Sequence, residues 1–332
     1  MEFFLYILPH APSGVIEPIH CPLSAVNCLL SAVRSLLSTD YCPLPIVYWD
    51  SINAAVLVAI ISDIHSNLEA LSAVLREIDR LGAREIYCLG DIVGYGPRPH
   101  ECIGIIRSRC RAVVRGNHDN GAVDRLPLER FTSDGAEALL YTQRITHPNH
   151  LRFLRHLPYV YQKDDITLVH ASPYAPKRFR YVVNDRRVER AFQAFSTRVC
   201  FIGHTHIPFI FEEALEGSRR SIDVEVAARL MESTAELIPV VESEEVEEEE
   251  EAPEETTMIE SNTRFPYHRR LIMVGSVGQP RDGNPRAAFG LYDTETGLYL
   301  PRRVEYDIQK TADDIVRVGL PKALAKRLTR GL

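Results

Sequence analysis

The chain has 332 residues, of which 45% are apolar and 25% are charged, a composition that is ordinary for a folded globular protein. The formal net charge of the chain is −7, but the short stretch from Glu242 to Glu255 alone contains ten glutamates. Without that stretch the rest of the chain is slightly basic. That balance excludes a strongly basic nucleic-acid binder, and we expect no stable complex with nucleic acid. Seven cysteines without a Cys-x-x-Cys pair argue against a disulfide framework or a structural zinc site and favour reduced thiols.

The first 53 residues show no clear period, and prolines at positions 9, 12, 18, 22, 43 and 45 interrupt them. We interpret residues 1–53 as an extension outside the main fold, either disordered or produced by a translation start placed too far upstream. The chain has no apolar run of the roughly 18 residues that a transmembrane helix needs, so we expect no membrane partner. Its apolar start contains Glu2 but no lysine or arginine before Leu8, unlike a secretory signal, which favours a cytoplasmic location.

The main domain is predicted to cover residues 54–332 and to begin with alternating strands and helices. The apolar run 56–61 is typical of a strand buried on both faces. Ser66 and Glu69 then have the spacing of a capping box, and apolar residues follow at helical spacing until Gly82. Further strands at 85–89 and 112–115 and a helix at 98–109 complete a βαβαβ pattern, which predicts a parallel sheet.

The rest of the chain contains further predicted elements around one long interruption. Helices are expected at 133–146, 148–156 and 188–195, and strands at 159–162, 166–169 and 199–202. Residues 213–266 break the pattern, and we interpret them as an inserted, partly disordered acidic loop with a short helical pattern at 224–231. Beyond it we expect antiparallel strands at 271–274, 287–292 and 298–306, a hairpin turn at 293–297, and one helix at 311–329.

Polar side chains collect directly after the apolar strands. They are Asp63, His65, Asp91, Asn117, His118, Asp119, His170, His204 and His206. Because open α/β sheets bind ligands at the carboxyl ends of their strands, we expect these side chains to converge. Oxygen and imidazole groups without a thiolate suit Mn²⁺, Fe, Zn²⁺ or Ni²⁺ better than Ca²⁺.

Each of these patterns alone has an ordinary structural explanation. A Gly-Asp pair after a strand is usually a turn, a His-x-His pair is often a solvated strand face, and a lone histidine is often hydrogen-bonded in the core. Their shared position, each just past an apolar strand, favours a common metal site. The ligands suffice for two ions, which together can activate a water and stabilise the charge of a phosphoryl group.

Five motifs resemble the calcineurin-like metallophosphoesterase superfamily. They are Asp63-x-His65, Gly90-Asp91-x-x-Gly94, Gly116-Asn117-His118-Asp119, His170, and Gly203-His204-x-His206. Residues 62–67 and 275–283, with the ending at 306–308 and 319–321, are similar to its small bacterial and archaeal phosphodiesterase-like branch. The resemblance implies an α/β fold, a four-layer αββα sandwich of two mixed sheets, with a dinuclear metal site at the carboxyl ends of the strands.

The resemblance also implies a role for each site residue. The first ion would be held by Asp63, His65 and His206, the second by Asn117, His170 and His204, and Asp91 would bridge them. His118 would protonate the leaving oxygen, and Asp119 would hydrogen-bond to its ring and fix the tautomer. The implied cofactors are two divalent ions, Mn²⁺ first and Fe, Zn²⁺ or Ni²⁺ as alternatives, with a bridging hydroxide as the nucleophile.

The predicted function is therefore metal-dependent hydrolysis of a phosphate ester by a phosphodiesterase. Its partner would be a small-molecule ester, nucleotide-like esters included. A phosphoprotein phosphatase is one alternative, although that branch usually has Asp-Arg-Gly where this chain has Gly94-Tyr95-Gly96, and Glu in place of Asp119. A scaffold without catalysis is another, although such relatives tend to lose the acid histidine. The substrate, the native metal and the oligomeric state stay open.

Two further residues have two interpretations each. Arg281 lies in a loop rich in glycine and proline, and it either contacts a substrate phosphate or stabilises that loop. Asn67 either approaches the site or caps the first helix, and we favour the cap. The glutamate run of the insertion is a solvated loop in the simplest interpretation, and a docking segment for a basic partner in the other.

Overall fold

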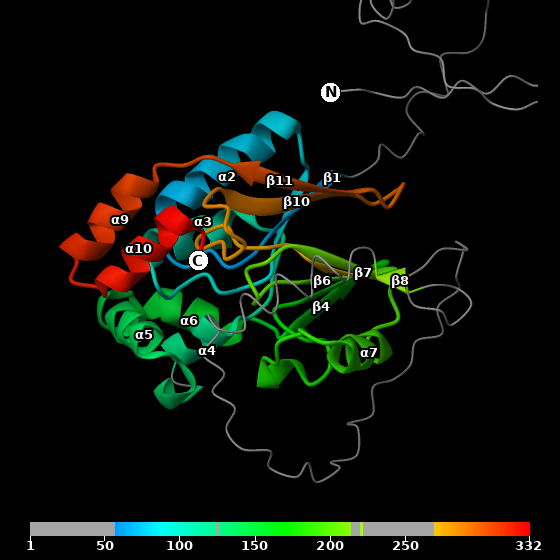
Figure 1. Cartoon of the computed structure of the whole chain (residues 1–332), viewed down its shortest axis with the longest axis horizontal. Coiled ribbons are helices and arrows are strands. Elements are labelled where there is room, and N and C mark those ends of the chain that lie inside the picture. Colours follow the sequence, from blue (N-terminus) through cyan, green and yellow to red (C-terminus); the bar gives the residue numbers. More distant parts are fainter. Residues whose placement is uncertain (1–56, 124–125, 214–219, 222–268) are drawn as a thin grey trace, which may run out of the picture. The chain divides into compact units, whose positions relative to one another are not determined.

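The computed structural model describes residues 57–123, 126–213, 220–221 and 269–332, which belong to the unit Ala55–Leu332 (Figure 1). The predicted extension 1–53 lies outside these residues, as do nearly all of the predicted insertion 213–266 and its helical pattern at 224–231. None of the described helices is long and apolar enough to cross a membrane.

The first β-sheet is mixed, and its five described strands have the order β11-β10-β1-β2-β3. These strands are β1 (Leu57–Ile61), β2 (Glu85–Cys88), β3 (Ala112–Val113), β10 (Ala287–Asp293) and β11 (Tyr299–Val304). β1, β2 and β3 run parallel, which confirms the predicted βαβαβ unit. The connections are α2 (Leu68–Leu81) and α3 (Pro99–Arg109). β10 pairs antiparallel with β1 and forms the predicted hairpin with β11.

The second sheet is also mixed, with six described strands in the order β4-β5-β6-β9-β7-β8. They are β4 (Val160–Lys163), β5 (Ile166–Val169), β6 (Val199–Ile202), β7 (Phe209–Glu212), β8 (Arg220–Ser221) and β9 (Arg270–Met273). The prediction that residues 271–274 pair antiparallel with the strands after them is wrong. β9 lies in this second sheet, parallel to β6 and antiparallel to β7, because the chain crosses between the sheets after Met273.

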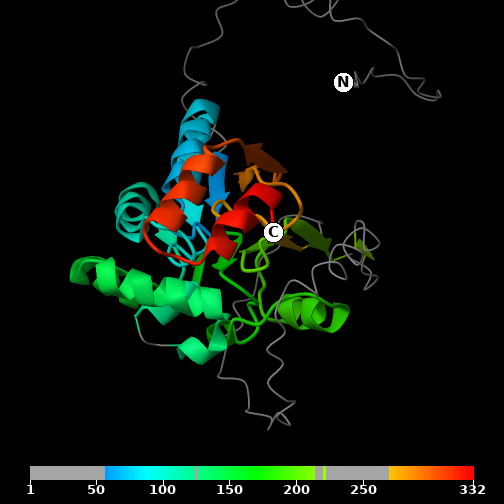
Figure 2. The same ribbon diagram turned by 60° about the vertical axis from the view of Figure 1, so that its left-hand side comes forward.

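Alternating side chains of β1 explain why the two sheets stack. Val58 and Ile60 belong to the core between the sheets, together with Phe201 and Ile272 of the second sheet. Ala59 and Ile61 face the other way, into the core that α2 and α3 cover. α7 (Asp185–Gln193) covers the outer face of the second sheet through Phe192 and its neighbours (Figure 2). The predicted four-layer αββα sandwich is thus confirmed.

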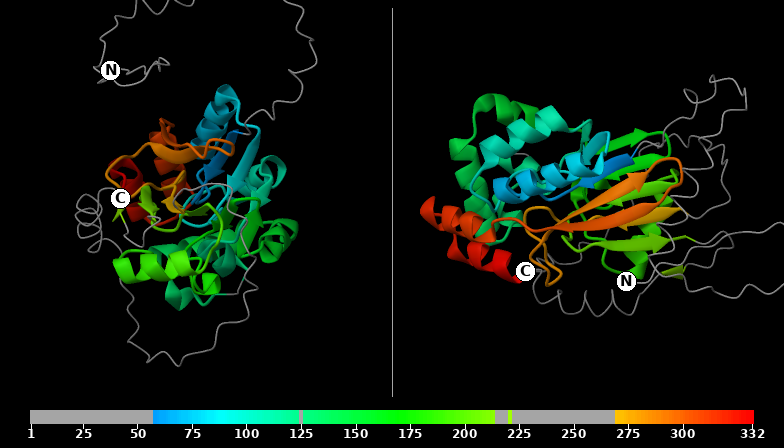
Figure 3. Two further views of the ribbon diagram at one scale, coloured as in Figure 1. Left: turned by 90° about the vertical axis from the view of Figure 1, so that its right-hand side faces the viewer. Right: turned by 90° about the horizontal axis from the view of Figure 1, so that it is seen from above.

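Four of the described helices gather at one end of the strands, where the loops of the parallel strands lie (Figures 1 and 3). They are α5 (Ser133–Ile145), α6 (Pro148–His156), α9 (Ile308–Arg317) and α10 (Lys322–Arg330). The single C-terminal helix expected at 311–329 is wrong. Gly319 has φ +83°, which ends α9, and Pro321 precedes a second helix because proline suits a helix start but not its interior.

The start of α2 also differs from the prediction. Asn67 is the N-cap, because its Oδ1 accepts a hydrogen bond from the amide of Ala70 at 3.1 Å. Ser66 has φ +53° and lies one residue before the cap, so it does not form the expected capping box with Glu69. The other end is as predicted, since Gly82 closes α2 with φ +74°.

Candidate metal centre

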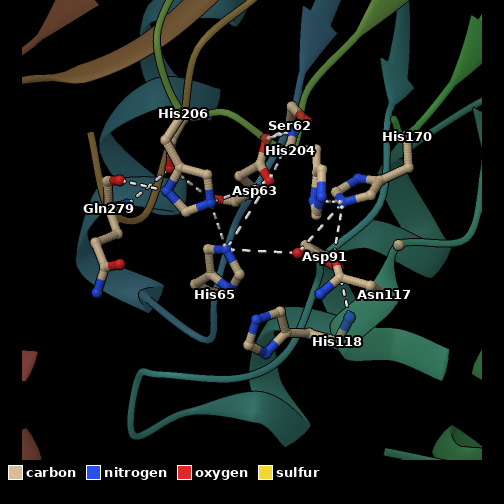
Figure 4. A network of polar contacts seen from close by, with 12 residues as sticks. Ser62, Asp63, His65, Asp91, Asn117, His118, His170, His204, His206 and Gln279 are labelled. Atoms are coloured by element: carbon tan, nitrogen blue, oxygen red, sulfur yellow. Dashed lines mark hydrogen bonds and ion pairs between the residues drawn. The ribbon is translucent and has the colours of Figure 1, made fainter. Parts of the chain in front are cut away.

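The predicted ligands converge where the parallel strands of both sheets end (Figure 4). In the first sheet, Asp63 and His65 follow β1, Asp91 follows β2, and Asn117 opens α4 (Asn117–Ala122) just after β3. In the second sheet, His170 follows β5, and His204 and His206 follow β6. Because β1 of the first sheet and β6 of the second end at the same site, residues 63 and 206 come together there.

The first group consists of Asp63, His65 and His206, which we call the first half of the site. Their ligand atoms lie close together, with 3.0 Å between the Nε2 atoms of His65 and His206. The Nε2 of His206 is 3.3 Å from Asp63 Oδ1, and that of His65 is 3.9 Å from the same oxygen. All three side chains are buried.

The second half consists of Asn117, His170 and His204. The Nε2 of His170 lies 3.1 Å from Asn117 Oδ1 and 3.2 Å from His204 Nδ1. Asp91 stands between the halves, because its Oδ2 is 3.4 Å from His170 Nε2 and 3.7 Å from His65 Nε2. Asp91 thus lies between the ligand atoms of the two halves.

Backbone carbonyls fix the tautomers of three of these histidines. The Nδ1 atoms of His65, His170 and His206 lie 3.0, 2.8 and 2.6 Å from the carbonyl oxygens of Val93, Leu89 and Gln279. A carbonyl only accepts, so each Nδ1 donates, and the Nε2 of a neutral ring presents a lone pair to the centre. In the first half, the Nε2 atoms of His65 and His206 lie 3.0 Å apart. Their lone pairs repel each other, and a cation between them would relieve that repulsion. The residues therefore fit a bound metal.

Burial and mutual charges also prepare these groups as ligands. Burial raises the pKa of Asp63, but the histidines, His206 first, hold it well below its usual range. Burial lowers the pKa of His204 to about 3, so this ring is neutral at neutral pH. Burial also lowers the pKa of His170, yet Asp91 raises it to about 9, so without metal a proton occupies the position that a cation would take.

The backbone at the site is held in unusual conformations. Asp63, His65, Asp91, His204 and His206 all have positive φ values, between 48° and 68°, which non-glycine residues seldom adopt. The motif glycines leave room for the carboxylates. A Cβ on Gly116 would lie 2.0 Å from Asp91 Oδ1, and one on Gly203 would lie 2.5 Å from Asp63 Oδ2.

His118 lies beside the centre, and one of its ring nitrogens lies within 4.8 Å of ligand atoms of His65 and Asp91. Its backbone amide donates to Asp91 Oδ1 at 2.8 Å. Its ring contacts three other rings, His65, Tyr95 and Phe131, with centroids 4.5 to 5.0 Å away. The buried Nδ1 has no hydrogen-bond partner among the described residues and stands over Gly94, where a Cβ would come within 2.3 Å. Burial lowers the pKa of His118 to about 4.

The hydrogen bond predicted between Asp119 and the ring of His118 is not formed in the structure. Asp119 Oδ1 accepts from the amides of Ile92 and Val93 at 2.9 and 3.4 Å, and Oδ2 accepts from Gly116 at 3.0 Å. Because Asp119 is the third residue of α4, its carboxylate turns back to the helix start rather than toward the ring. Asp119 therefore joins the loop of Asp91 to the start of α4.

The sequence pattern missed the aromatic side chains around the ligands. Tyr181 stacks on His204 with a centroid distance of 4.1 Å and an interplanar angle of 19°. Tyr95 lies 4.6 Å from His65 and 4.5 Å from His118. Tyr95 stands inside the glycine-rich segment after Asp91, so its proximity could have been inferred. Tyr181 had no comparable signal.

Comparisons with known proteins agree with this geometry. The family model "Calcineurin-like phosphoesterase" matches residues 56–208. An uncharacterised protein of Methanocaldococcus jannaschii is 36% identical over 280 residues, covering 83% of this chain and 98% of that protein. A crystal structure of a metallophosphoesterase from Sphaerobacter thermophilus has 33% identity and a TM-score of 0.63, covering 84% of this chain and all of that one (100%). A hypothetical protein from Pyrococcus horikoshii, 21% identical, shares the fold with a TM-score of 0.59, over 83% of this chain and 98% of that one.

Proposed function

The chain belongs to the calcineurin-like phosphoesterase family, and we propose that it is a phosphodiesterase that acts on small-molecule phosphate esters, nucleotide-like ones included. Family membership makes it a metal-dependent phosphoester hydrolase. The observation that supports the proposal most is the convergence of carboxylate, amide and imidazole ligands at the strand ends, with the Nε2 atoms of His65 and His206 only 3.0 Å apart.

The family and the ligand cluster together indicate a dinuclear divalent metal site. In our proposal the first half holds one ion, the second half holds the other, and Asp91 contributes to both; Mn²⁺ is the first candidate. When bound, such a pair of ions makes a water nucleophilic near neutral pH and stabilises the charge on phosphoryl oxygens. The chain itself supplies fixed ligand orientations, through the carbonyls of Leu89, Val93 and Gln279.

In our proposal His118 gives a proton to the leaving oxygen. Its ring is adjacent to His65, so it stands beside the place where the phosphoryl group would bind. Burial keeps the free ring neutral, with a pKa of about 4, and a bound phosphate anion would raise that pKa because it stabilises the imidazolium. The packing of Tyr95 and Phe131 on the ring takes the orienting role that we had expected of Asp119.

The choice of a diester rests on the similarity of residues 62–67 and 275–283 to the phosphodiesterase-like branch. The test is a substrate panel on Mn²⁺-loaded protein of measured metal content. It compares bis(p-nitrophenyl) phosphate, p-nitrophenyl phosphate, cyclic nucleotides and a phosphopeptide, with Asp91→Ala protein as the blank. We expect the highest kcat/KM with a diester. A clear preference for the monoester or the phosphopeptide would overturn the diester assignment, and no turnover of any ester would overturn the proposal.

A further inference from the structure

One cation beside the centre has no role in the mechanism above. Arg281 lies in the loop that follows β9, and its backbone amide donates to the carbonyl of His206 at 3.3 Å. Its guanidinium carbon stands 5.6 Å from the ring centroid of Tyr95, and Nη2 donates to Gln279 Oε1 at 2.9 Å. Since Tyr95 itself packs on His65 and His118, the guanidinium lies next to both the first half and the proposed acid.

The loop of Arg281 is firmly attached to the ligand loop after β1. The amides of Val277 and Gly278 donate to the carbonyls of Ser62 and Asp63, each at 2.9 Å. A Cβ on Gly278 would lie 2.0 Å from the carbonyl oxygen of Ile64, so only glycine allows this approach. Beyond Arg281, the Gly283 amide donates to the carbonyl of Gly331 at 3.0 Å. The base of the Arg281 side chain is therefore fixed before any ligand arrives.

Within the described ranges Arg281 forms no direct ion pair with a carboxylate, whereas Asp282 beside it pairs with Arg303. The guanidinium has five N–H groups, and its contacts with Gln279 and Tyr95 leave donors over. The residue as a whole is only partly buried. A partly desolvated guanidinium with unused donors is well suited to bind an oxyanion.

We propose that Arg281 is a substrate-binding residue whose guanidinium hydrogen-bonds a non-bridging oxygen of the phosphoryl group held at the metal centre. The inference rests on the proposed function, because it takes the ester as the ligand. It assigns Gln279 and Tyr95 as the pair that orients the guanidinium, and it explains why a loop of the second sheet is attached to the ligand loop of the first. The competing explanation is that Arg281 only stabilises its loop.

The test measures phosphate binding directly, with inorganic phosphate as the probe. Mn²⁺-loaded wild type, Arg281→Gln and Arg281→Lys are titrated calorimetrically and compared in steady-state assays, with metal content and Tm measured for each. Arg302→Gln is the matched control, because Arg302 is an exposed arginine on β11. We expect Arg281→Gln to weaken phosphate binding about 10- to 100-fold and to raise KM similarly, with a smaller change in kcat. Arg281→Lys should recover part of the loss, and Arg302→Gln should match the wild type.

The outcomes separate this inference from the proposed function. If Arg281→Gln keeps its metals and binds phosphate as tightly as the wild type, the inference is wrong even where esters are hydrolysed. If phosphate binding depends on Arg281 but no ester is hydrolysed, the binding site stands and the proposed function fails. Should Arg281→Gln lose its metals or its fold, Arg281→Lys decides. Wild-type Tm and metal content with weaker phosphate binding support the inference, and wild-type phosphate binding refutes it.

Discussion

The half of the site around Asp63 and the half around His170 use similar side chains but differ in charge. The first half has a carboxylate of its own, whereas the second has Asn117, His170 and His204, which are neutral when they bind a metal, beside the Asp91 that we propose both ions share. Because the affinity of a site for divalent ions is tuned by the charge of its ligands, we infer that the first half holds its ion more tightly. The second ion is then the one that exchanges more readily.

The two halves are also fastened differently. Asp63 accepts hydrogen bonds from Ser62 Oγ at 2.6 Å and from the His204 amide at 3.1 Å, so it connects the loops of the two sheets. In the second half, Asn117 is only partly buried and depends on the start of α4, which the carboxylate of Asp119 holds. The first half is therefore anchored by its own carboxylate, and the second by the residues around it. Four experiments test that contrast.

Removing the shared carboxylate should have the largest effect. We expect Asp91→Ala to lose both ions and to reduce kcat/KM by more than the ~10²–10⁴-fold typical of losing a general acid. Asp63→Ala should retain at most one ion. Metal analysis of the purified variants and assays in saturating Mn²⁺ check both statements. Full metal content in Asp91→Ala would show that the halves do not share this residue.

Removing the proposed acid should leave both halves intact. His118→Ala should retain its metals and lose about 10²–10⁴ in kcat for an ester with a poor leaving group. The loss should be much smaller for bis(p-nitrophenyl) phosphate, because p-nitrophenolate leaves without a proton. Rates with both esters and the metal content of the variant provide the check. Equal losses for the two substrates would contradict the acid role.

Asp119 should act on stability through the second half. Asp119→Asn replaces one of two acceptor oxygens that take three backbone N–H bonds, so we expect a loss of ~1–3 kcal/mol in the free energy of unfolding. Denaturant midpoints of the metal-free proteins measure it. Asp165→Asn, in the exposed turn before β5, is the control and should change little. An unchanged midpoint in Asp119→Asn would mean that the carboxylate does not hold α4.

The difference in affinity between the halves should be the smallest of these effects. Stripped protein titrated with Mn²⁺ should bind two ions in steps that differ by about tenfold or more. The tighter step should disappear in Asp63→Asn, and the weaker one in His204→Ala. Two equal steps would show that the halves do not differ in affinity. Loss of the weaker step in Asp63→Asn would show that the second half binds Mn²⁺ more tightly.

Much of the fold could be predicted because its signals are local. The bounds of α6 and β6 were predicted to the residue, since each apolar pattern ends at a clear break in the sequence. The split between α9 and α10 was missed although Gly319 and Pro321 mark it, because the apolar period continues across them. The partner of β9 could not be read from the sequence, because strand pairing depends on residues far away along the chain.

By itself the sequence determined which residues would meet, because each candidate ligand directly follows an apolar strand and parallel strands end at a common edge. How they meet follows from contacts between segments that lie far apart along the chain. The fold placed the carbonyls of Leu89, Val93 and Gln279 against three imidazoles, turned Asp119 toward the backbone, and set Arg281 over Tyr95. Those arrangements depend on contacts between distant segments, such as the one between Asp63 and His206, 143 positions apart, and no local pattern of residues encodes such contacts.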